Sequence, residues 1–210
     1  MNPKRASPPR AQGRAIAVFA KVPEAGVVKT RLIPELGAEG AAALQARLIE
    51  GTLAKAHAVG DASVCLWLAG ATATYRVPPG QRWQVQQGAD LGAKMAHAFL
   101  VTLARARACV LIGTDCPALL PAHVRRAFAE LEQHDVVVIP AEDGGYVLIG
   151  LNAPQPRLFE DIKWGGPTVM QATRARIEAA GLHAAYLPAL PDLDTPSDLA
   201  RARAAGWLDF

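Results

Sequence analysis

The chain has 210 residues, of which 51% are hydrophobic and 20% charged, which is typical of a globular protein that buries a core. The formal net charge is +3, but four basic residues among the first 14 carry +4, so the remainder carries about −1. Because the chain also lacks an apolar run of about 18 residues, we expect neither a membrane span nor a nucleic-acid partner.

The first 13 residues contain proline and basic side chains but no apolar stretch of the kind found in a signal peptide. We expect a disordered basic leader at 1–13, or alternatively a targeting segment, ahead of a single domain at 14–210. The three cysteines, Cys65, Cys109 and Cys116, form no CxxC pair. This pattern argues against disulfides and a zinc site and favours a cytoplasmic protein.

Strand and helix signals alternate along the chain. In chain order, they predict strand 15–20, helix 38–59, strands 63–68 and 83–85, helix 91–104, strand 109–112, helix 117–131, strands 136–139 and 146–149, helix 168–180, strand 183–187 and helix 196–205. Continuous apolar strands separated by helices indicate an α/β fold with a mostly parallel sheet covered on both faces. Ligands of such sheets bind beyond the carboxyl ends of the strands, so the polar residues that follow each strand are the site candidates.

The loop after the first strand is the most informative segment. Lys21, Lys29 and Arg31 supply positive charge, Thr30 supplies a hydroxyl, and Gly26 lets main-chain N–H groups approach an anion. The loop matches neither the Walker A motif nor the dinucleotide fingerprint. It therefore predicts a polyphosphate site of another kind, with a solvated surface turn as the alternative.

A carboxylate follows the buried strand 109–112. Asp115 could hold a hard cation that bridges phosphate oxygens, or it could cap the helix expected to begin at Pro117. Near the end of the chain, Asp192 and Asp194 lie two apart on an extended segment and should point to the same side. Either Asp194 or Thr195 could cap the last helix.

Two further segments are candidates for substrate contacts. Asp143, Gly144 and Gly145 lie between two strands, where the glycines permit close approach to a ligand, although a plain turn is the alternative. The segment from Gln86 to Lys94, which includes Asp90, could contact the base or the acceptor.

Six motifs in this order resemble one bacterial family over about residues 14–200: AKVPEAGVVKTRL, QQGADLGAKM, LIGTDCPAL, AEDGGYVLIGL, IKWGGPTV and DLDTPSDL. The family consists of GT-A-like proteins of largely unknown function, labelled nucleotide-diphospho-sugar transferases or glycosyltransferases. It is similar to the molybdenum-cofactor and phospholactate guanylyltransferases. The resemblance implies a Rossmann-like GT-A fold, a nucleotide in the first half of the sheet, and Mg²⁺ or Mn²⁺ as cofactor.

The resemblance also implies roles for particular residues. Matched by motif, the phosphate-binding residues are Lys21, Gly26, Lys29 and Arg31, and the metal ligands are Asp115 and Asp194, the latter through similarity to the end of sugar-acid cytidylyltransferases. We add Thr30 and Asp90 as nucleotide contacts, and Asp143, Gly144, Gly145 and Trp164 as acceptor contacts. After Trp164 the chain reads Gly-Gly-Pro-Thr where relatives should read Gly-Thr-Ser-Thr. This departure would alter the site if those hydroxyls touch the acceptor.

These features favour nucleotidyl transfer from a nucleoside triphosphate to a small phosphorylated or acidic acceptor. Lys29 and Arg31 would stabilise the leaving pyrophosphate, and a metal at Asp115 would complete the catalytic set. Glycosyl transfer from a nucleotide-sugar is the nearest alternative, and a non-catalytic nucleotide-binding protein is another. The sequence leaves the base, the acceptor and the oligomeric state open.

Overall fold

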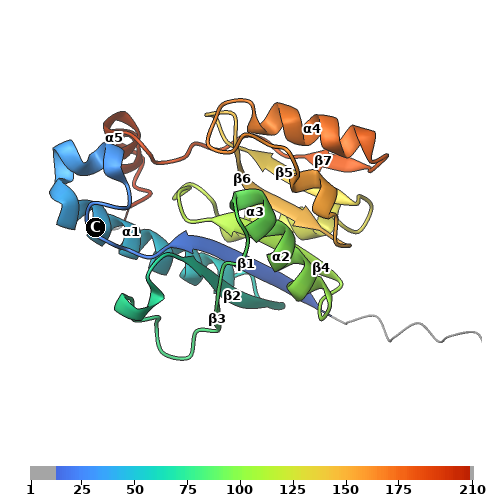
Figure 1. Cartoon of the computed structure of the whole chain (residues 1–210), viewed down its shortest axis with the longest axis horizontal. Coiled ribbons are helices and arrows are strands. Elements are labelled where there is room, and N and C mark those ends of the chain that lie inside the picture. The colour runs from blue at the N-terminus through green and yellow to red at the C-terminus, as the bar shows by residue number, and fades with distance from the viewer. Residues whose placement is uncertain (1–12, 209–210) are drawn as a thin grey trace, which may run out of the picture.

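The computed structural model describes residues 13–208 (Figure 1). Apart from Gly13, the expected leader therefore lies outside the described residues, and the expected single domain at 14–210 stays a prediction. No helix within 13–208 has both the length and the apolar character that a bilayer crossing requires.

A single sheet of seven strands runs through the described part of the chain (Figure 1). The strands are β1 (Arg14–Lys21), β2 (Ala62–Ala69), β3 (Trp83–Val85), β4 (Ala108–Gly113), β5 (Val136–Pro140), β6 (Tyr146–Leu151) and β7 (Ala184–Tyr186), in the spatial order β3-β2-β1-β4-β6-β5-β7. Every pairing is parallel except the two made by β6. The prediction of a mostly parallel sheet is confirmed.

The helices are α1 (Ile33–His57), α2 (Leu91–Leu103), α3 (Pro121–Glu130), α4 (Val169–Ala179) and α5 (Pro196–Ala204), with short 3-10 turns at Thr30–Leu32, Thr72–Thr74 and Pro156–Phe159. The predicted start of α1 at 38 falls after a kink, because Gly37 interrupts the helix with φ 71. The predicted start of α3 at Pro117 is wrong. Pro121 occupies the first turn instead, and residues 116–119 form a separate turn closed by Leu119 N–H on the carbonyl of Cys116.

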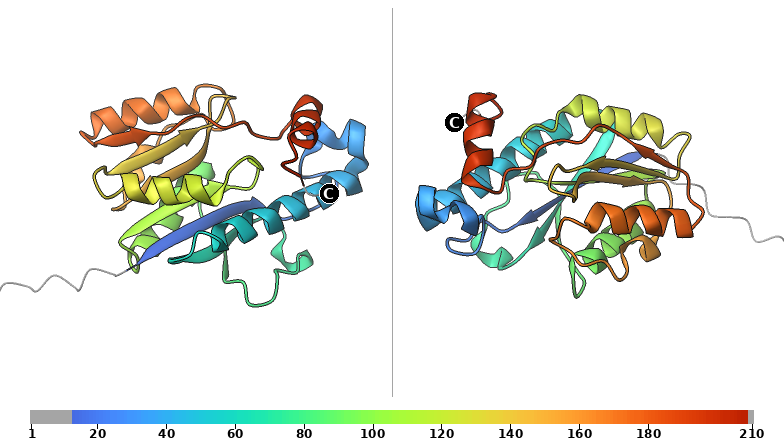
Figure 2. Two further views of the ribbon diagram at one scale, coloured as in Figure 1. Left: turned by 180° about the vertical axis from the view of Figure 1, so that it is seen from behind. Right: turned by 90° about the horizontal axis from the view of Figure 1, so that it is seen from above.

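The helices cover both faces of the sheet (Figure 2). On one face α1 and α3 share an apolar cluster with strand residues such as Val18 and Ile112, and on the other α2 and α4 share a cluster with Phe19 and Trp67. Successive strand residues point to opposite faces, which is why the strands read as continuous apolar runs. Burial of each large apolar side chain contributes about 1.5–3 kcal/mol, so these two layers hold the strand ends in fixed positions.

A third apolar cluster joins α1 to α5. Leu193 and Leu199, which flank the start of α5, pack with Leu32, which precedes α1, and with Leu44 and Leu48 of α1. Figure 1 shows α5 beside the beginning of α1. This contact brings the Asp192–Asp194 segment next to the basic loop that follows β1.

Candidate functional site

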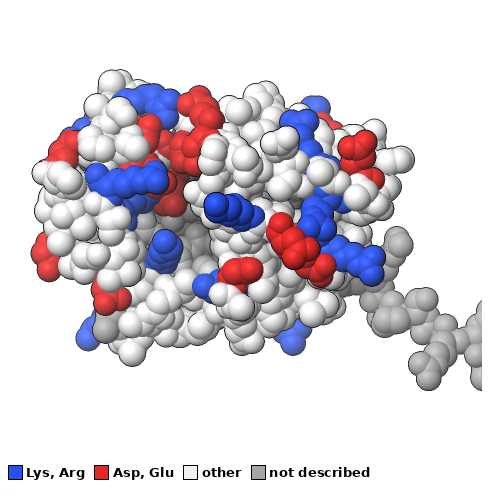
Figure 3. All heavy atoms as spheres, turned by 45° about the horizontal axis from the view of Figure 1, so that its top comes forward, with Lys and Arg blue, Asp and Glu red and all other residues white. Residues whose placement is uncertain are grey.

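The carboxyl edge of the sheet opens into a cavity of about 660 Å³. It lies where β1 and β4 end side by side. The next strand after β1, β2, lies on the other side of β1 from β4, so the strand order reverses at this point. Such a switch point is where open α/β sheets bind ligands. Figure 3 shows a hollow on this face with both basic and acidic side chains around it.

Most of the residues expected in a site line this one cavity. They are Lys21, Lys29, Thr30, Arg31, Asp115, Asp143, Gly145, Trp164 and Asp194. Gly26, Asp90 and Gly144 do not line it. The Asp90 carboxylate instead caps α2 by accepting a hydrogen bond of 2.8 Å from the N–H of Ala93.

Lys29 lies at the centre of the charged part of the site. Its Nζ is 2.7 Å from Oδ1 of Asp115 and 3.0 Å from Oδ1 of Asp194, and it also donates to the carbonyl of Leu193. The side chain is only 4% exposed, whereas those of Asp115 and Asp194 are 53% and 42% exposed. The ammonium group is thus enclosed, while both carboxylates stay open to a ligand.

The environment of Lys29 stabilises its charge. Burial by itself lowers the pKa of the ammonium, but the negative charges of Asp115 and Asp194 and the hydrogen bonds to them outweigh burial and raise the pKa above its ordinary value. The residue has φ 48 and ψ 39, which is the left-handed conformation that side chains other than Gly, Asn and Asp rarely adopt. That conformation directs the side chain from the loop toward the two carboxylates.

Neither Asp115 nor Asp194 caps a helix, as the residues at the starts of α3 and α5 show. Asp115 does not cap α3, because the residue before its first turn is Leu120. Thr195 caps α5 by accepting from the N–H of Asp198, which leaves the carboxylate of Asp194 free of that role. Both acids are therefore available for charge-based functions.

Three other cations face the cavity. Lys21, Arg31 and Lys94 line it, and none of them forms an ion pair with a carboxylate of residues 13–208. The sequence predicts Lys94 only as part of the 86–94 segment that could contact the base or the acceptor, because its motif carries no phosphate signature. Lys94 lies three residues after Leu91, the first residue of α2, so it belongs to the first turn of the helix at the cavity edge.

Gln45 is a cavity residue that the sequence did not indicate. It is 3% exposed, and its Nε2 donates to the carbonyl of Lys21 and to Oγ1 of Thr114, both at 3.3 Å. These bonds join α1 to the ends of β1 and β4. Gln45 therefore fixes the spacing of the two strands from which Lys21 and Asp115 extend.

Asp192 shares the cavity with Asp143 and Asp194. Partial burial, followed by the charges of Asp143, Asp194 and Asp198, raises the pKa of Asp192 to about 6. The acidic side of the cavity therefore includes a carboxyl group that is harder to ionise than an ordinary aspartate.

Aromatic and apolar side chains form the opposite wall. The rings of Tyr146 and Trp164 meet edge to face at 6.4 Å, and the Tyr146 hydroxyl contacts the sulfur of Met95. All three residues line the cavity, together with Leu91. This wall can accept the apolar part of a nucleotide or an acceptor.

The Gly-Gly-Pro-Thr departure lies mostly behind this wall. Gly165 lines the cavity, whereas Gly166, Pro167 and Thr168 do not. Pro167 packs so closely on the main chain at Gly144 that a Cβ there would collide with it. The departure thus affects the support of the turn that holds Asp143.

The pair Asp115 and Asp194 fits a magnesium or manganese ion. Within residues 13–208 there is no cluster of three or more His, Cys, Asp or Glu side chains that could enclose a metal. The two carboxylates nevertheless converge on one cation, the Lys29 ammonium. Mg²⁺ is commonly held by one or two carboxylates, with water and substrate phosphates as the other ligands, so these two carboxylates match the protein ligands that it needs.

Comparisons with known proteins agree on the fold. A structure from Desulfovibrio desulfuricans G20, provisionally assigned as a nucleotide-diphospho-sugar transferase, is 33% identical with a TM-score of 0.83, over 89% of this chain and 84% of that one. Rv0371c of Mycobacterium tuberculosis H37Rv, solved with manganese, is 19% identical with a TM-score of 0.56, over 95% of this chain and 100% of that one. A CMP:2-keto-3-deoxy-manno-octonic acid synthetase solved with CTP is 12% identical with a TM-score of 0.59, over 94% and 100%. The last two likenesses concern the fold alone.

The Rossmann-like GT-A fold and the resemblance to nucleotide-diphospho-sugar transferases are confirmed. The comparison with curated proteins gives no match. A family profile described as "Uncharacterized protein conserved in bacteria (DUF2064)" matches residues 52–166, which is more than half of the chain. The chain belongs to this DUF2064 family.

Proposed function

We propose that this chain is a metal-dependent nucleotidyltransferase that uses a nucleoside triphosphate and a small phosphorylated or acidic acceptor. One observation carries the proposal: two open carboxylates converge on one cation in a cavity that three unpaired basic side chains also face. A triphosphate with its metal carries both kinds of charge that such a cavity complements. The solved relatives that contain CTP and manganese support the proposal.

The basic side chains would act on the phosphates. Lys21, Arg31 and Lys94 neutralise the triphosphate, and their contacts strengthen as negative charge builds on the leaving pyrophosphate. An acceptor oxygen attacks the α-phosphorus, the bond to the bridging oxygen breaks, and pyrophosphate leaves. Arg31 suits the leaving group because its planar guanidinium can bind two phosphate oxygens at once.

Asp115 and Asp194 would hold Mg²⁺ or Mn²⁺. When bound, this ion supplies charge neutralisation on the phosphate oxygens. Gln45 keeps the ends of β1 and β4 at a constant spacing, so the cationic side chains and the carboxylates stay in one orientation. The wall at Tyr146 and Trp164 excludes water from part of the cavity and is the proposed acceptor side, together with Asp143 and Gly145, while Gly144 supports the turn between them.

Glycosyl transfer from a nucleotide-sugar is the second candidate, favoured by the provisional assignment of the D. desulfuricans protein. Two assays with Mn²⁺ separate the candidates: pyrophosphate release from the four nucleoside triphosphates with a panel of sugar phosphates and sugar acids, and nucleoside diphosphate release from nucleotide-sugars. We expect pyrophosphate release. Nucleoside diphosphate release alone would replace this proposal by glycosyl transfer, and binding without turnover would favour a nucleotide sensor.

A thermal-shift screen identifies the nucleotide before any acceptor is known. A ligand that binds the native state raises the melting temperature in proportion to the logarithm of its concentration above its Kd. We expect a larger shift for a triphosphate with Mn²⁺ than for either alone. Because nucleotides are cytosolic metabolites and the thiols of Cys65, Cys109 and Cys116 are free, we also propose a cytoplasmic location.

A further inference from the structure

The ammonium group of Lys29 lies between the two carboxylates that the proposed metal requires. We propose that Lys29 is an internal substitute for the metal: it competes with a divalent cation for Asp115 and Asp194, and it moves onto the nucleotide phosphates when the metal binds. Metal and nucleotide would then bind cooperatively. This inference rests on the proposed function, because it concerns the same two carboxylates.

The first argument is the saturation of the ammonium group. An ammonium has three hydrogens to donate, and that of Lys29 is surrounded by three oxygen atoms: it donates to Asp194 at 3.0 Å and to the carbonyl of Leu193, and it forms an ion pair with Asp115 at 2.7 Å. With 4% of its side chain exposed, Lys29 has no free donor for a phosphate in this state. A contact with phosphate therefore requires the ammonium to leave at least one carboxylate.

The second argument is that the two cations exclude each other. Mg²⁺ binds carboxylate oxygen at about 2.0–2.1 Å, which is closer than either nitrogen–oxygen distance of Lys29. An ion shared by Asp115 and Asp194 would thus take the space of the ammonium group. Two positive charges at this separation also repel strongly, because the site is only partly open to water.

The third argument is that the main chain that carries Asp115 and Asp194 does not depend on Lys29 for its position. The N–H of Leu193 donates to the carbonyl of Asp115 at 2.7 Å, and Thr195 fixes the start of α5. Without the ammonium, the two carboxylates would stay close together with uncompensated charge. Such a pair should bind a divalent cation more tightly than it does in the wild-type protein.

The fourth argument concerns where the ammonium can go. Lys29 has a flexible four-carbon stem, and Thr30 and Arg31, its neighbours in the chain, line the cavity. If no anion were bound, an ammonium displaced from the two carboxylates would have no negatively charged partner in the cavity that could replace them. Bound phosphates supply that partner, so each ligand lowers the cost of binding the other, and the coupling is reciprocal.

The test measures Mn²⁺ binding without turnover, by the electron paramagnetic resonance signal of free Mn²⁺, in the wild type, Lys29→Met and Lys29→Gln. Met removes the charge and keeps the stem, and Gln is the second variant should the Met protein fold poorly, as checked by thermal melting. Lys94→Met is the matched control, because it removes the same charge from the same cavity at a residue that pairs with neither carboxylate.

We expect both Lys29 variants to bind Mn²⁺ alone at least about tenfold more tightly than the wild type, and Lys94→Met to change this affinity much less. Inorganic tripolyphosphate serves as the anion, which avoids any dependence on the base. The affinity of the wild type for tripolyphosphate should rise when Mn²⁺ is added. This rise should be smaller in the Lys29 variants. Mn²⁺ also associates with tripolyphosphate in free solution. This association is the same in the titration of each protein, so it cancels in the comparison.

Two results would overturn the inference in different ways. If the Lys29 variants bind Mn²⁺ alone no more tightly than the wild type, while the wild type still binds Mn²⁺ with tripolyphosphate, the competition is wrong and the proposed function stands. If neither the wild type nor any of the variants binds Mn²⁺, with or without tripolyphosphate, the inference and the metal-dependent function fail together.

Discussion

The main-chain N–H of Leu193 donates a hydrogen bond of 2.7 Å to the carbonyl oxygen of Asp115. This single bond joins the segment after β4 to the segment before α5, two parts of the chain that are far apart in sequence. It places Asp194 beside Asp115, so the meeting of the two carboxylates is built into the main chain. The two acids are therefore held as neighbours by the main chain rather than by their side chains alone.

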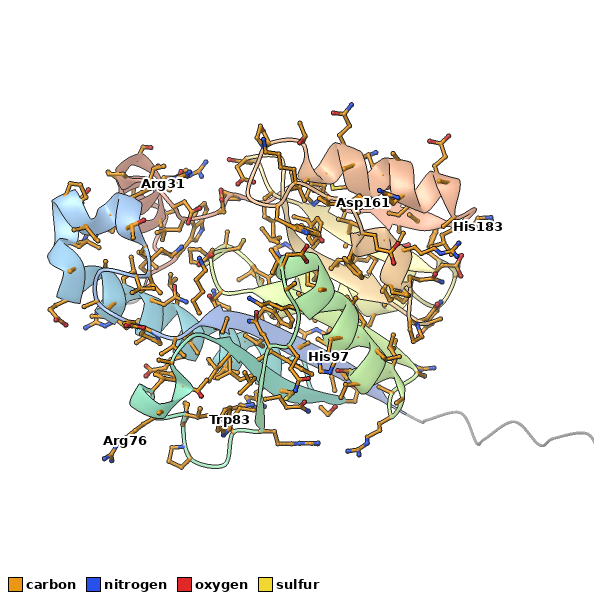
Figure 4. The ribbon with its side chains drawn as sticks, viewed as in Figure 1. Arg31, Arg76, Trp83, His97, Asp161 and His183 are labelled. Atoms are coloured by element: carbon orange, nitrogen blue, oxygen red, sulfur yellow. The ribbon has the colours of Figure 1, made fainter. Side chains whose placement is uncertain are left out.

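We predict that Asp115→Asn and Asp194→Asn each lower metal-dependent turnover by about 100-fold or more, which is the range found when one charge-stabilising group is removed from an active site. Asn keeps the shape of the side chain but loses the charge that holds the cation. Steady-state kinetics on the substrates found by the assays above, and Mn²⁺ titration, measure the loss. Asp161→Asn is the control, because Asp161 is exposed and does not line the cavity (Figure 4). Unchanged kinetics in Asp115→Asn would remove Asp115 from the site.

We predict that Arg31→Ala weakens nucleoside triphosphate binding by about tenfold at low salt, because a hydrogen bond to a charged group contributes about 1.5–3 kcal/mol. Arg31 is exposed at the cavity, so salt screens its charge and the difference from wild type should shrink as ionic strength rises. Isothermal titration calorimetry at two salt concentrations measures both effects. Arg76→Ala, on a distant part of the surface in Figure 4, should change neither. An equal loss in both variants would indicate a general charge effect.

The sequence was sufficient to predict most strands, because continuous apolar runs between turns have few other structural explanations. It also located the cavity, since the carboxyl ends of parallel strands share one edge. The start of α3 was mistaken because Pro117 and Pro121 both satisfy the preference for proline in a first helical turn. A local preference could not decide between two equivalent candidates.

Contacts between distant segments could not be predicted in this way. The pairing of Lys29 with Asp115 and Asp194 depends on the third apolar cluster, which holds α5 beside α1. Lys94 and Gln45 lie on helices, where only the packing of the helix decides which side chains face a cavity. Gln45 leaves no local pattern in the sequence, and the sequence indicates Lys94 only as part of the 86–94 segment.

We predict that Gly144→Ala lowers the free energy of unfolding by about 3 kcal/mol and Gly165→Ala by about 1 kcal/mol. Both glycines have positive φ, 94 and 77, so both substitutions add the strain of a left-handed residue. Only at Gly144 would the new Cβ also collide with main-chain atoms of Pro167, whereas the space at Gly165 is open. Urea unfolding measures the difference, and equal losses would contradict the close approach at Gly144.

We predict that Asp198→Ala lowers the free energy of unfolding by about 1 kcal/mol at pH 7, as for the loss of a helix cap. The Asp198 carboxylate accepts from the N–H and hydroxyl of Thr195 and the N–H of Asp194. Burial alone raises the pKa of Asp198, but these bonds and Arg201 outweigh burial and lower the pKa below its ordinary value of 3.8. A lowered pKa in the folded state means that the stabilisation is complete above the unfolded pKa and is lost as pH falls through the folded one. Urea unfolding at pH 7 and at the lowest pH with reversible unfolding should therefore show the difference between wild type and variant shrinking in acid. A constant difference would mean that the cap does not depend on the charge of Asp198.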